Sequence, residues 1–266
     1  MAHCWDRFQT VLPLLVTELT QLRQPAIERP HVEGPVAARM VQACAPFAAE
    51  RFITPMAAVA GAVADELIET FKRADLRRAF INNGGDIALH LTAGEKYRVG
   101  IWSEIERLDL RDGSGPALDS IFEVGAQMPV RGVATSGWRG RSFSLGIADS
   151  VTVLADSAAS ADAAATLIAN AVNCDFAGII RAPAEKLKDD TDLGTRLVTV
   201  DVPPLPPASI AAALERGRTE AEYWRDHGLI HAAALFLQSE VEVVLPKTNA
   251  PANRAKLRVG HAGVRA

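Results

Sequence analysis

The sequence contains few of the features that mark specialised classes of protein. Three cysteines occur in 266 residues, Cys4, Cys44 and Cys174. They are odd in number and far apart, and they form no Cys-x-x-Cys pair and no zinc-type Cys/His spacing, so a reducing compartment is the simplest interpretation. The chain also has no P-loop, no GxGxxG fingerprint, no GxSxG elbow and no HExxH helix. The commonest motifs of nucleotide-binding and hydrolytic enzymes therefore do not account for it.

Long hydrophobic runs and a charge excess are also missing. The apolar run at residues 11–16 contains Pro13, has no basic lead-in and is too short to span a membrane. We therefore expect a cytoplasmic protein with no membrane partner. Lys and Arg number 28 and Asp and Glu 32, a net charge of −4, which argues against a broad nucleic-acid surface. Hydrophobic residues make up 48% of the chain, enough for a substantial core.

Proline and charge patterns divide the chain into three segments. Residues 1–34 are expected to be an irregular N-terminal segment, because Pro25 and Pro30 exclude a continuous helix towards its end; residues 8–22 fit either a strand or a short helix. Residues 35–246 are expected to form a single α+β domain. Residues 247–266 carry several basic side chains and are predicted to be a mobile basic tail.

Within the central domain, hydrophobic patterns predict an antiparallel meander packed with Ala- and Gly-rich helices. Helices are expected at 35–47, 54–73, 161–172 and 209–227, and short strands at 79–91, 97–102, 121–126, 130–135, 143–146, 150–155, 197–202 and 240–245. Residues 104–118 are predicted to be a loop and residues 179–192 a charged linker. The strands between 79 and 155 are expected to follow one another in a single meander.

The stretch 133–170 organises the rest of the chain. Its strand at 150–155 leads into an Ala-rich helix on which Asp162 and Thr166 are four residues apart, so both side chains lie on one face. A carboxylate and a hydroxyl provide two oxygen ligands for a hard cation such as Mg²⁺. The alternative is that Asp162 interacts with the helix dipole and Thr166 bonds its own backbone. The spacing alone favours this alternative.

Two polar turns precede that helix. The first contains Asn83, Gly84, Gly85 and Asp86, and the second contains Thr135, Ser136, Gly137, Arg139 and Arg141. Gly-Gly between two apolar runs predicts a tight hairpin, and the polar groups beside it exceed what a turn needs. Backbone N–H groups and guanidinium donors in such turns can bind an anion. Ordinary hairpins with solvated arginines remain the alternative.

These stretches resemble the ApbE superfamily in order and approximate spacing. The resemblance is carried by the Asn-Asn-Gly-Gly-Asp turn (82–86), the Ala-Thr-Ser-Gly turn (134–137), Ser-Val-Thr-Val-Leu-Ala (150–155) and Ala-Asp-Ala-Ala-Ala-Thr (161–166). The stretch Pro-Met-Ala-Ala-Val-Ala-Gly at 55–61 is similar to the cytoplasmic branch known as uncharacterised protein family 0280. The resemblance covers roughly residues 35–175.

The resemblance implies an α+β fold and a Mg²⁺-dependent transferase that splits the FAD pyrophosphate and attaches FMN to a protein hydroxyl. It implies Asp162 and Thr166 as metal ligands and the two turns as the lining of a nucleotide cleft. The chain departs from these transferases in three ways. It lacks their His-x-x-Asp-Pro segment between the second turn and the strand at 150–155, it has Ala60 where they carry a lysine, and it shows no lipoprotein leader.

Three functions therefore stay open from the sequence. The protein is an enzyme that handles FAD or another nucleotide with Mg²⁺, or a non-catalytic binding or accessory protein that keeps the scaffold. The third alternative is an enzyme for another small anionic substrate, with a cleft reshaped by Arg139 and Arg141. The ligand expected in each case is a nucleotide or a small anion. Whether the chain forms a homo-oligomer stays open as well.

Overall fold

A six-stranded antiparallel sheet lies at the centre of the structure, with strand order β1-β2-β5-β6-β9-β10. The computed structural model describes residues 2–101 and 120–247. The strands are β1 (Arg78–Asn83), β2 (Asp86–Leu91), β3 (Lys96–Ile101), β4 (Ser120–Gly125), β5 (Gly132–Ser136), β6 (Ser150–Ala155), β7 (Ile180–Pro183), β8 (Leu197–Asp201), β9 (Ala232–Leu237) and β10 (Glu240–Val244). The fold is therefore α+β, as the sequence predicts.

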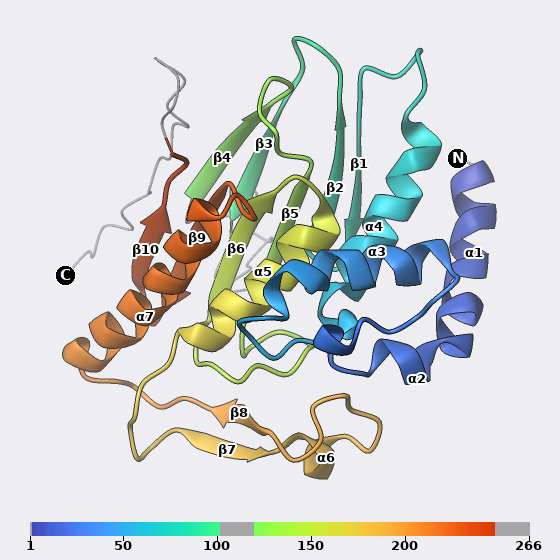
Figure 1. Cartoon of the computed structure of the whole chain (residues 1–266). Coiled ribbons are helices and arrows are strands. Elements are labelled where there is room, and N and C mark those ends of the chain that lie inside the picture. Colours follow the sequence, from blue (N-terminus) through green and yellow to red (C-terminus); the bar gives the residue numbers. More distant parts are fainter. Residues whose placement is uncertain (1, 102–119, 248–266) are drawn as a thin grey trace, which may run out of the picture.

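Helices cover one face of this sheet, and the β3–β4 hairpin covers the other (Figure 1). The α-helices are α1 (Ala2–Thr17), α2 (Leu19–Leu22), α3 (Pro35–Cys44), α4 (Val59–Ile68), α5 (Ala158–Ala171), α6 (Ala184–Leu187) and α7 (Pro207–Asp226). Short 3₁₀ turns are η1 (Ala26–Glu28), η2 (Ala45–Phe47), η3 (Pro55–Ala58) and η4 (Glu69–Phe71). The main core is on the helical side, where α3, α4, α5 and α7 pack against the sheet.

Alternation along the strands explains the two faces. Val151 and Val153 of β6 point into the helical core, whereas Leu154 points toward the hairpin and packs with Phe122 and Val124. All six residues of β6 are buried, because this strand lies between β5 and β9 and is covered on both faces. The strand predicted at 150–155 and the Ala-rich helix after it are confirmed.

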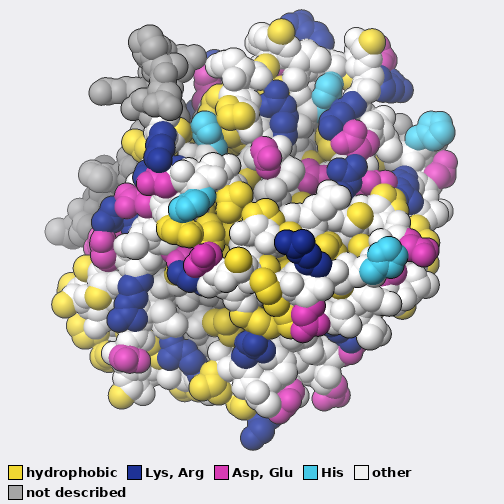
Figure 2. Space-filling model, viewed as in Figure 1, with side chains coloured by type: hydrophobic (Ala, Val, Ile, Leu, Met, Phe, Trp, Pro, Cys, Tyr) yellow, Lys and Arg dark blue, Asp and Glu magenta, His cyan; other side chains and the backbone are white. Residues whose placement is uncertain are grey.

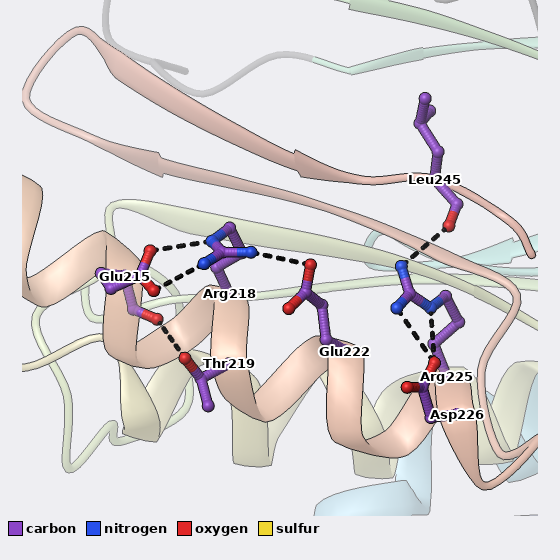
Figure 3. A network of polar contacts seen from close by, with 7 residues as sticks. All are labelled: Glu215, Arg218, Thr219, Glu222, Arg225, Asp226 and Leu245. Carbon is purple, nitrogen blue, oxygen red and sulfur yellow. Dashed lines mark hydrogen bonds and ion pairs between the residues drawn. The ribbon is translucent and has the colours of Figure 1, made fainter.

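Helix α7 is fastened to the far edge of the sheet. Figure 3 shows a row of charged side chains on its exposed side: Arg218 pairs with Glu215 and Glu222, and Arg225 donates to the carbonyl of Leu245 just beyond β10. Exposed pairs of this kind contribute only about 0.3–0.5 kcal/mol each. Burial of Trp224 against Phe47 beneath the helix is therefore the stronger attachment.

The N-terminal segment corrects the first expectation. Residues 2–17 form helix α1, and α2 and η1 follow within the segment expected to be irregular. Val11 and Leu15, four residues apart, are buried and hold α1 on the protein. Pro13 lies on the exposed side of α1, where the carbonyl it leaves without a donor can be solvated. The division into domains stays a prediction.

Three further expectations about strands are wrong. Strands β3 and β4 form a separate two-stranded sheet, so 79–155 is not one meander and β2 pairs with β5 instead. Residues 143–146 form no strand, because the amides of Leu145 and Ile147 bond to the C-terminal end of α5. The expected linker at 179–192 contains β7, paired with β8, and α6. The predicted loop at 104–118 and the tail at 248–266 lie outside the described residues.

Charges of both signs are interspersed over the helical face of the molecule (Figure 2). This distribution agrees with the small net charge. The expected absence of a nucleic-acid partner stays a prediction. Among the described helices, none is long and apolar enough to cross a membrane. Cytoplasmic location stays a prediction.

Candidate functional site

The first polar turn lies where β1 and β2 meet, facing the first turns of α4 and α5. Asn83 and Asp86 are paired across the hairpin, and Gly84 and Gly85 have φ values of 71° and 116°. Such positive φ values at both central residues are accessible mainly to glycine. The hairpin predicted from the sequence is therefore confirmed, and its backbone conformation requires the Gly-Gly pair.

One peptide unit connects this hairpin to Asp162. The N–H of Gly61 donates to Asp162 Oδ2 at 3.0 Å, and Asn83 Nδ2 donates to the carbonyl of Ala60 at 3.0 Å. Both bonds are made by the Ala60–Gly61 peptide at the start of α4. The structure thus brings two of the predicted site residues, Asn83 and Asp162, to opposite sides of the same amide group.

Helices α4 and α5 cross very closely at this point. A Cβ atom on Gly61 would lie 2.2 Å from the carbonyl oxygen of Ala158, which is less than any ordinary contact. Asp65, one turn further along α4, accepts hydrogen bonds from the N–H groups of Ala158 and Ala159 at 3.0 and 2.8 Å. Asp65 therefore caps the N-terminus of α5, and this role was missed from the sequence because nothing local indicates a cap on a distant helix.

Asp86 is enclosed by the sheet beside this crossing. It is 7% exposed, and its Oδ1 accepts the N–H of Thr135 at 3.2 Å, just beyond the last β2–β5 pair. Burial raises the pKa of Asp86 to about 6, against the opposing effects of the Thr135 N–H and the Arg141 guanidinium. Asp86 thus titrates near neutrality, in the range where functional carboxyl groups are often found.

The negative charge of Asp86 acts on Asp162. Burial raises the pKa of Asp162 well above its ordinary range, the negative charge of Asp86 raises it further, and the Gly61 and Ala60 amides oppose the shift. Two carboxyl groups whose charges interact in this way resist ionising together. A shared proton or a bound cation relieves that repulsion. Cys44 lies nearby, and its pKa is raised by burial and then by Asp162.

The two arginines of the second turn have different surroundings. Arg139 Nε donates to Asp149 Oδ1 at 3.0 Å, and its guanidinium lies 5.1 Å from the centre of the Trp138 ring. Arg141 instead lies over the hairpin: a Cβ atom on Gly84 would be 2.3 Å from its Nη2. Arg141 therefore extends the candidate site, whereas Arg139 is held in the fold of the second turn.

The remaining predicted residues are distributed unevenly. Thr135 contributes its N–H to Asp86, but its hydroxyl is 2.8 Å from the hydroxyl of Thr152. A Cβ on Gly137 would lie 2.3 Å from the carbonyl oxygen of Asp149, which gives this glycine a packing role. Ser136 and Thr166 are both half-buried, and Thr166 lies one helical turn beyond Asp162 on α5.

The available ligands suit a hard cation with an incomplete protein shell. The described residues contain no group of three or more His, Cys, Asp or Glu side chains that could hold a metal ion. Asp86 and Asp162 supply carboxylate oxygens, and Thr166 follows Asp162 at the helical spacing that places both on one face. Mg²⁺ commonly binds through one or two carboxylates and keeps waters or substrate phosphates as its other ligands. The donor set therefore fits Mg²⁺ held jointly with a phosphate-bearing ligand.

The fold and the site define an α+β protein with a polar site between a Gly-Gly hairpin and two crossing helices. The family model described as "AbpE bacteria" matches residues 1–243, and the chain belongs to this family. The prediction of an ApbE-like protein related to uncharacterised family 0280 is thus confirmed.

Archaeal UPF0280 proteins are similar to the chain. The protein from Methanothrix thermoacetophila is 37% identical over 142 residues, covering 53% of this chain and 54% of the relative. That from Methanoculleus marisnigri is 32% identical over 186 residues, covering 68% and 71%. The chain spans about half the length of the first of these relatives. The crystal structure of the ApbE protein from Thermotoga maritima is 16% identical, with a TM-score of 0.40 over 74% of this chain and 52% of that one.

Proposed function

We propose that the site binds a phosphate-bearing nucleotide, FAD foremost, together with Mg²⁺. The observation that carries this proposal is the pair Asp86 and Asp162, placed on β2 and α5 around the Ala60–Gly61 peptide and the hairpin, where the charge of Asp86 raises the pKa of Asp162. A divalent cation held by both carboxylates would neutralise their charges and remove the repulsion. Phosphate oxygens would complete its shell, as is usual for Mg²⁺.

The chain's own residues supply the remaining contacts. Asp162, with Thr166 one turn away, would hold the cation from α5, and Asp86 would hold it from β2. Arg141 lies over Gly84 beside Asp86, where its planar guanidinium can bind a phosphate in bidentate fashion. Mg²⁺, when bound, neutralises charge on a pyrophosphate and on a leaving phosphate. The reaction that we propose for this site is of the ApbE type, in which FMN is transferred from FAD to a hydroxyl group of another protein.

A second candidate is an enzyme or binding protein for a smaller anion. Arg141 is exposed and lies over the hairpin at Gly84, where its guanidinium can bind a small anion without a nucleotide base. The lysine and the His-x-x-Asp-Pro segment of the FMN transferases are absent from the sequence. Binding of inorganic pyrophosphate with Mg²⁺, and not of FAD, would favour this candidate.

The test is the melting temperature with FAD, FMN, ADP or pyrophosphate, each with and without Mg²⁺. A ligand at about 100 times its dissociation constant adds about 2.7 kcal/mol, which is several degrees for a chain of this size. We expect a Mg²⁺-dependent shift in the wild type that is lost in Asp162→Asn. Asp156→Asn is the matched control, because Asp156 is exposed just before the same helix. Absence of a shift with every ligand would contradict the proposal.

A further inference from the structure

Helix α1 is apolar over a wider arc than the protein covers. Val11 and Leu15 are buried against the core. A second stripe beside them consists of Trp5, Phe8, Leu12 and Val16, which are 59%, 48%, 69% and 57% exposed. At 100° per residue these four side chains fall within an arc of about 80°. They make one continuous ridge along the helix, which we call the outer stripe.

The outer stripe has the properties of an interface core. Its spacing of three, four and four residues is that of a helix–helix seam. Trp5 and Phe8 already contact each other, with ring centroids 5.9 Å apart, and aromatic anchors of this kind dominate protein interfaces. The four side chains would bury on the order of 400 Å² per copy, whereas a stable interface buries about 800 Å² per partner. The stripe therefore supplies roughly half of the area of such an interface. Polar neighbours such as Gln9 would form its rim and supply the remaining area.

Charge on α1 argues against a membrane as the occupant. Besides His3, the helix carries one acidic side chain, Asp6, and one basic side chain, Arg7. Arg7 is occupied, since its Nε donates to Glu66 Oε1 of α4 at 2.8 Å. Helices that lie on anionic membranes carry many Lys and Arg residues on their polar face. The surroundings of the outer stripe are close to neutral, which suits an identical surface.

The C-terminal part of the chain is also a poor occupant. Strand β10 is at the opposite edge of the sheet from β1, and α1 lies beyond α4 on the β1 side (Figure 1). The residues after Lys247 contain only three large aliphatic side chains, Leu257, Val259 and Val264, among several basic ones. Such a sequence cannot match a ridge with two aromatic anchors.

We propose that the outer stripe binds the outer stripe of a second copy of this chain. In this two-fold dimer the two α1 helices run antiparallel, and Phe8 and Leu12 of each copy pack near the axis. A two-fold interface requires a self-complementary patch, and a neutral apolar ridge meets that requirement without charge pairs. The dimer buries the exposed aromatic surface that a monomer would leave in water.

Sedimentation velocity of the full chain over a wide concentration range tests the dimer. We expect the wild type to sediment as a dimer and Leu12→Arg as a monomer with the far-UV circular dichroism spectrum of the wild type, because Leu12 is 69% exposed and contributes little to the core of the monomer. Leu197→Arg is the matched control, since Leu197 is 54% exposed on β8 and lies outside the stripe. It should leave the dimer intact.

A cross-link gives a readout that does not depend on disrupting the helix. Gln9→Cys in a Cys4→Ser background places a thiol beside the middle of the stripe, and mild oxidation should yield a disulfide-linked dimer. A wild type that stays monomeric, a dimer that survives Leu12→Arg, or a dimer lost equally in Leu197→Arg would each overturn the proposal. So would binding of the wild-type monomer to neutral lipid vesicles through α1.

Discussion

Asp65 and Asp162 cap each other's helices. Asp65 of α4 accepts the N–H groups of Ala158 and Ala159 at the start of α5, and Asp162 of α5 accepts the N–H of Gly61 at the start of α4. A carboxylate at a helix N-terminus satisfies donors that have no intrahelical partner and interacts favourably with the helix dipole. This reciprocal arrangement fixes how the two helices cross and holds Asp162 at the candidate site.

Removing the cap of α5 should destabilise the protein without touching the ligand directly. Asp65→Ala leaves two buried N–H groups unpaired and is expected to cost about 2–4 kcal/mol of unfolding free energy. Asp65→Asn keeps one acceptor oxygen and should cost less. Urea denaturation measures both. Ser157→Ala, which removes the side-chain bonds to the N–H and the hydroxyl of Ser160, is the comparison at about 1 kcal/mol. Equal losses in all three would contradict the capping role.

The helix crossing predicts a contrast between two glycines. Gly61→Ala places a methyl group against the backbone of Ala158, which cannot move without shifting α5. We expect this substitution to lower the free energy of unfolding by about 3 kcal/mol, the upper end of the range measured for overpacked cores. Gly217→Ala on α7 meets side-chain atoms instead, at 2.3 Å from Val172 Cγ2 and 2.7 Å from Leu235 Cδ2, and the gain of about 1 kcal/mol in helix propensity offsets part of its cost. Thermal unfolding of the two variants should therefore differ clearly, and equal melting temperatures would argue against a rigid crossing.

The pKa of Asp86 predicts how stability depends on pH. Its folded pKa of about 6 lies above the ordinary 3.8, so between these values the folded state holds a proton that the unfolded state has released. The contribution of Asp86 to stability is therefore full at low pH and falls as pH rises toward about 6, by roughly 3 kcal/mol at most. Asp86→Asn should remove this fall and be more stable than the wild type above about pH 7.

Denaturant unfolding at several pH values measures this effect. The direction of the change in unfolding free energy with pH is decisive. A carboxylate stabilised by an ion pair would make the protein more stable, not less, as pH rises from about 4 to 6. Mg²⁺ with a bound phosphate ligand should restore the stability of the wild type above the pKa of Asp86, and it should leave Asp86→Asn unchanged. A wild type whose stability rises between pH 4 and 6 through Asp86 would rule out the repulsive pair.

Substitution of Arg139 should affect stability, whereas substitution of Arg141 should affect ligand binding. Arg141→Ala removes the guanidinium over the hairpin and should weaken phosphate-ligand binding by about tenfold or more, since charge-assisted hydrogen bonds contribute about 1.5–3 kcal/mol. Arg139→Ala breaks the contact with Asp149 and should lower stability slightly while leaving affinity unchanged. Calorimetric titration with the best ligand of the melting screen measures both. Equal effects on affinity would mean that the second turn acts as one unit.

Local signals in the sequence account for the parts of the fold that were predicted. The Gly-Gly pair fixes the β1–β2 hairpin, and the β-branched run at 150–155 followed by alanines fixes β6 and α5. Pairings between distant segments could not be inferred in the same way. The hairpin β3–β4 leaves the central sheet because β2 finds a partner in β5, and neither strand carries a local sign of that choice.

In the candidate site, too, the sequence indicated the individual residues but not how distant segments bring them together. The sequence identified Asp86 and Asp162 separately, from a turn and from a helix face. Their placement in one site depends on the Ala60–Gly61 peptide, which Asp162 and the hairpin residue Asn83 bind from its two sides, and on a helix crossing that only the folded chain shows. Arg139 and Arg141 look equivalent in sequence, whereas in the structure Asp149, which accepts from Trp138, also accepts from Arg139 and not from Arg141.

Binding of Mn²⁺, as a paramagnetic substitute for Mg²⁺, tests the central claim most directly. Electron paramagnetic resonance should show weak binding by the wild-type protein alone and much tighter binding with FAD or pyrophosphate, with competition by Mg²⁺. Asp162→Asn and Asp86→Asn should each lose most of the bound signal, and Asp156→Asn should keep it. Equal Mn²⁺ binding by the wild type and Asp162→Asn in the presence of the ligand would contradict the account.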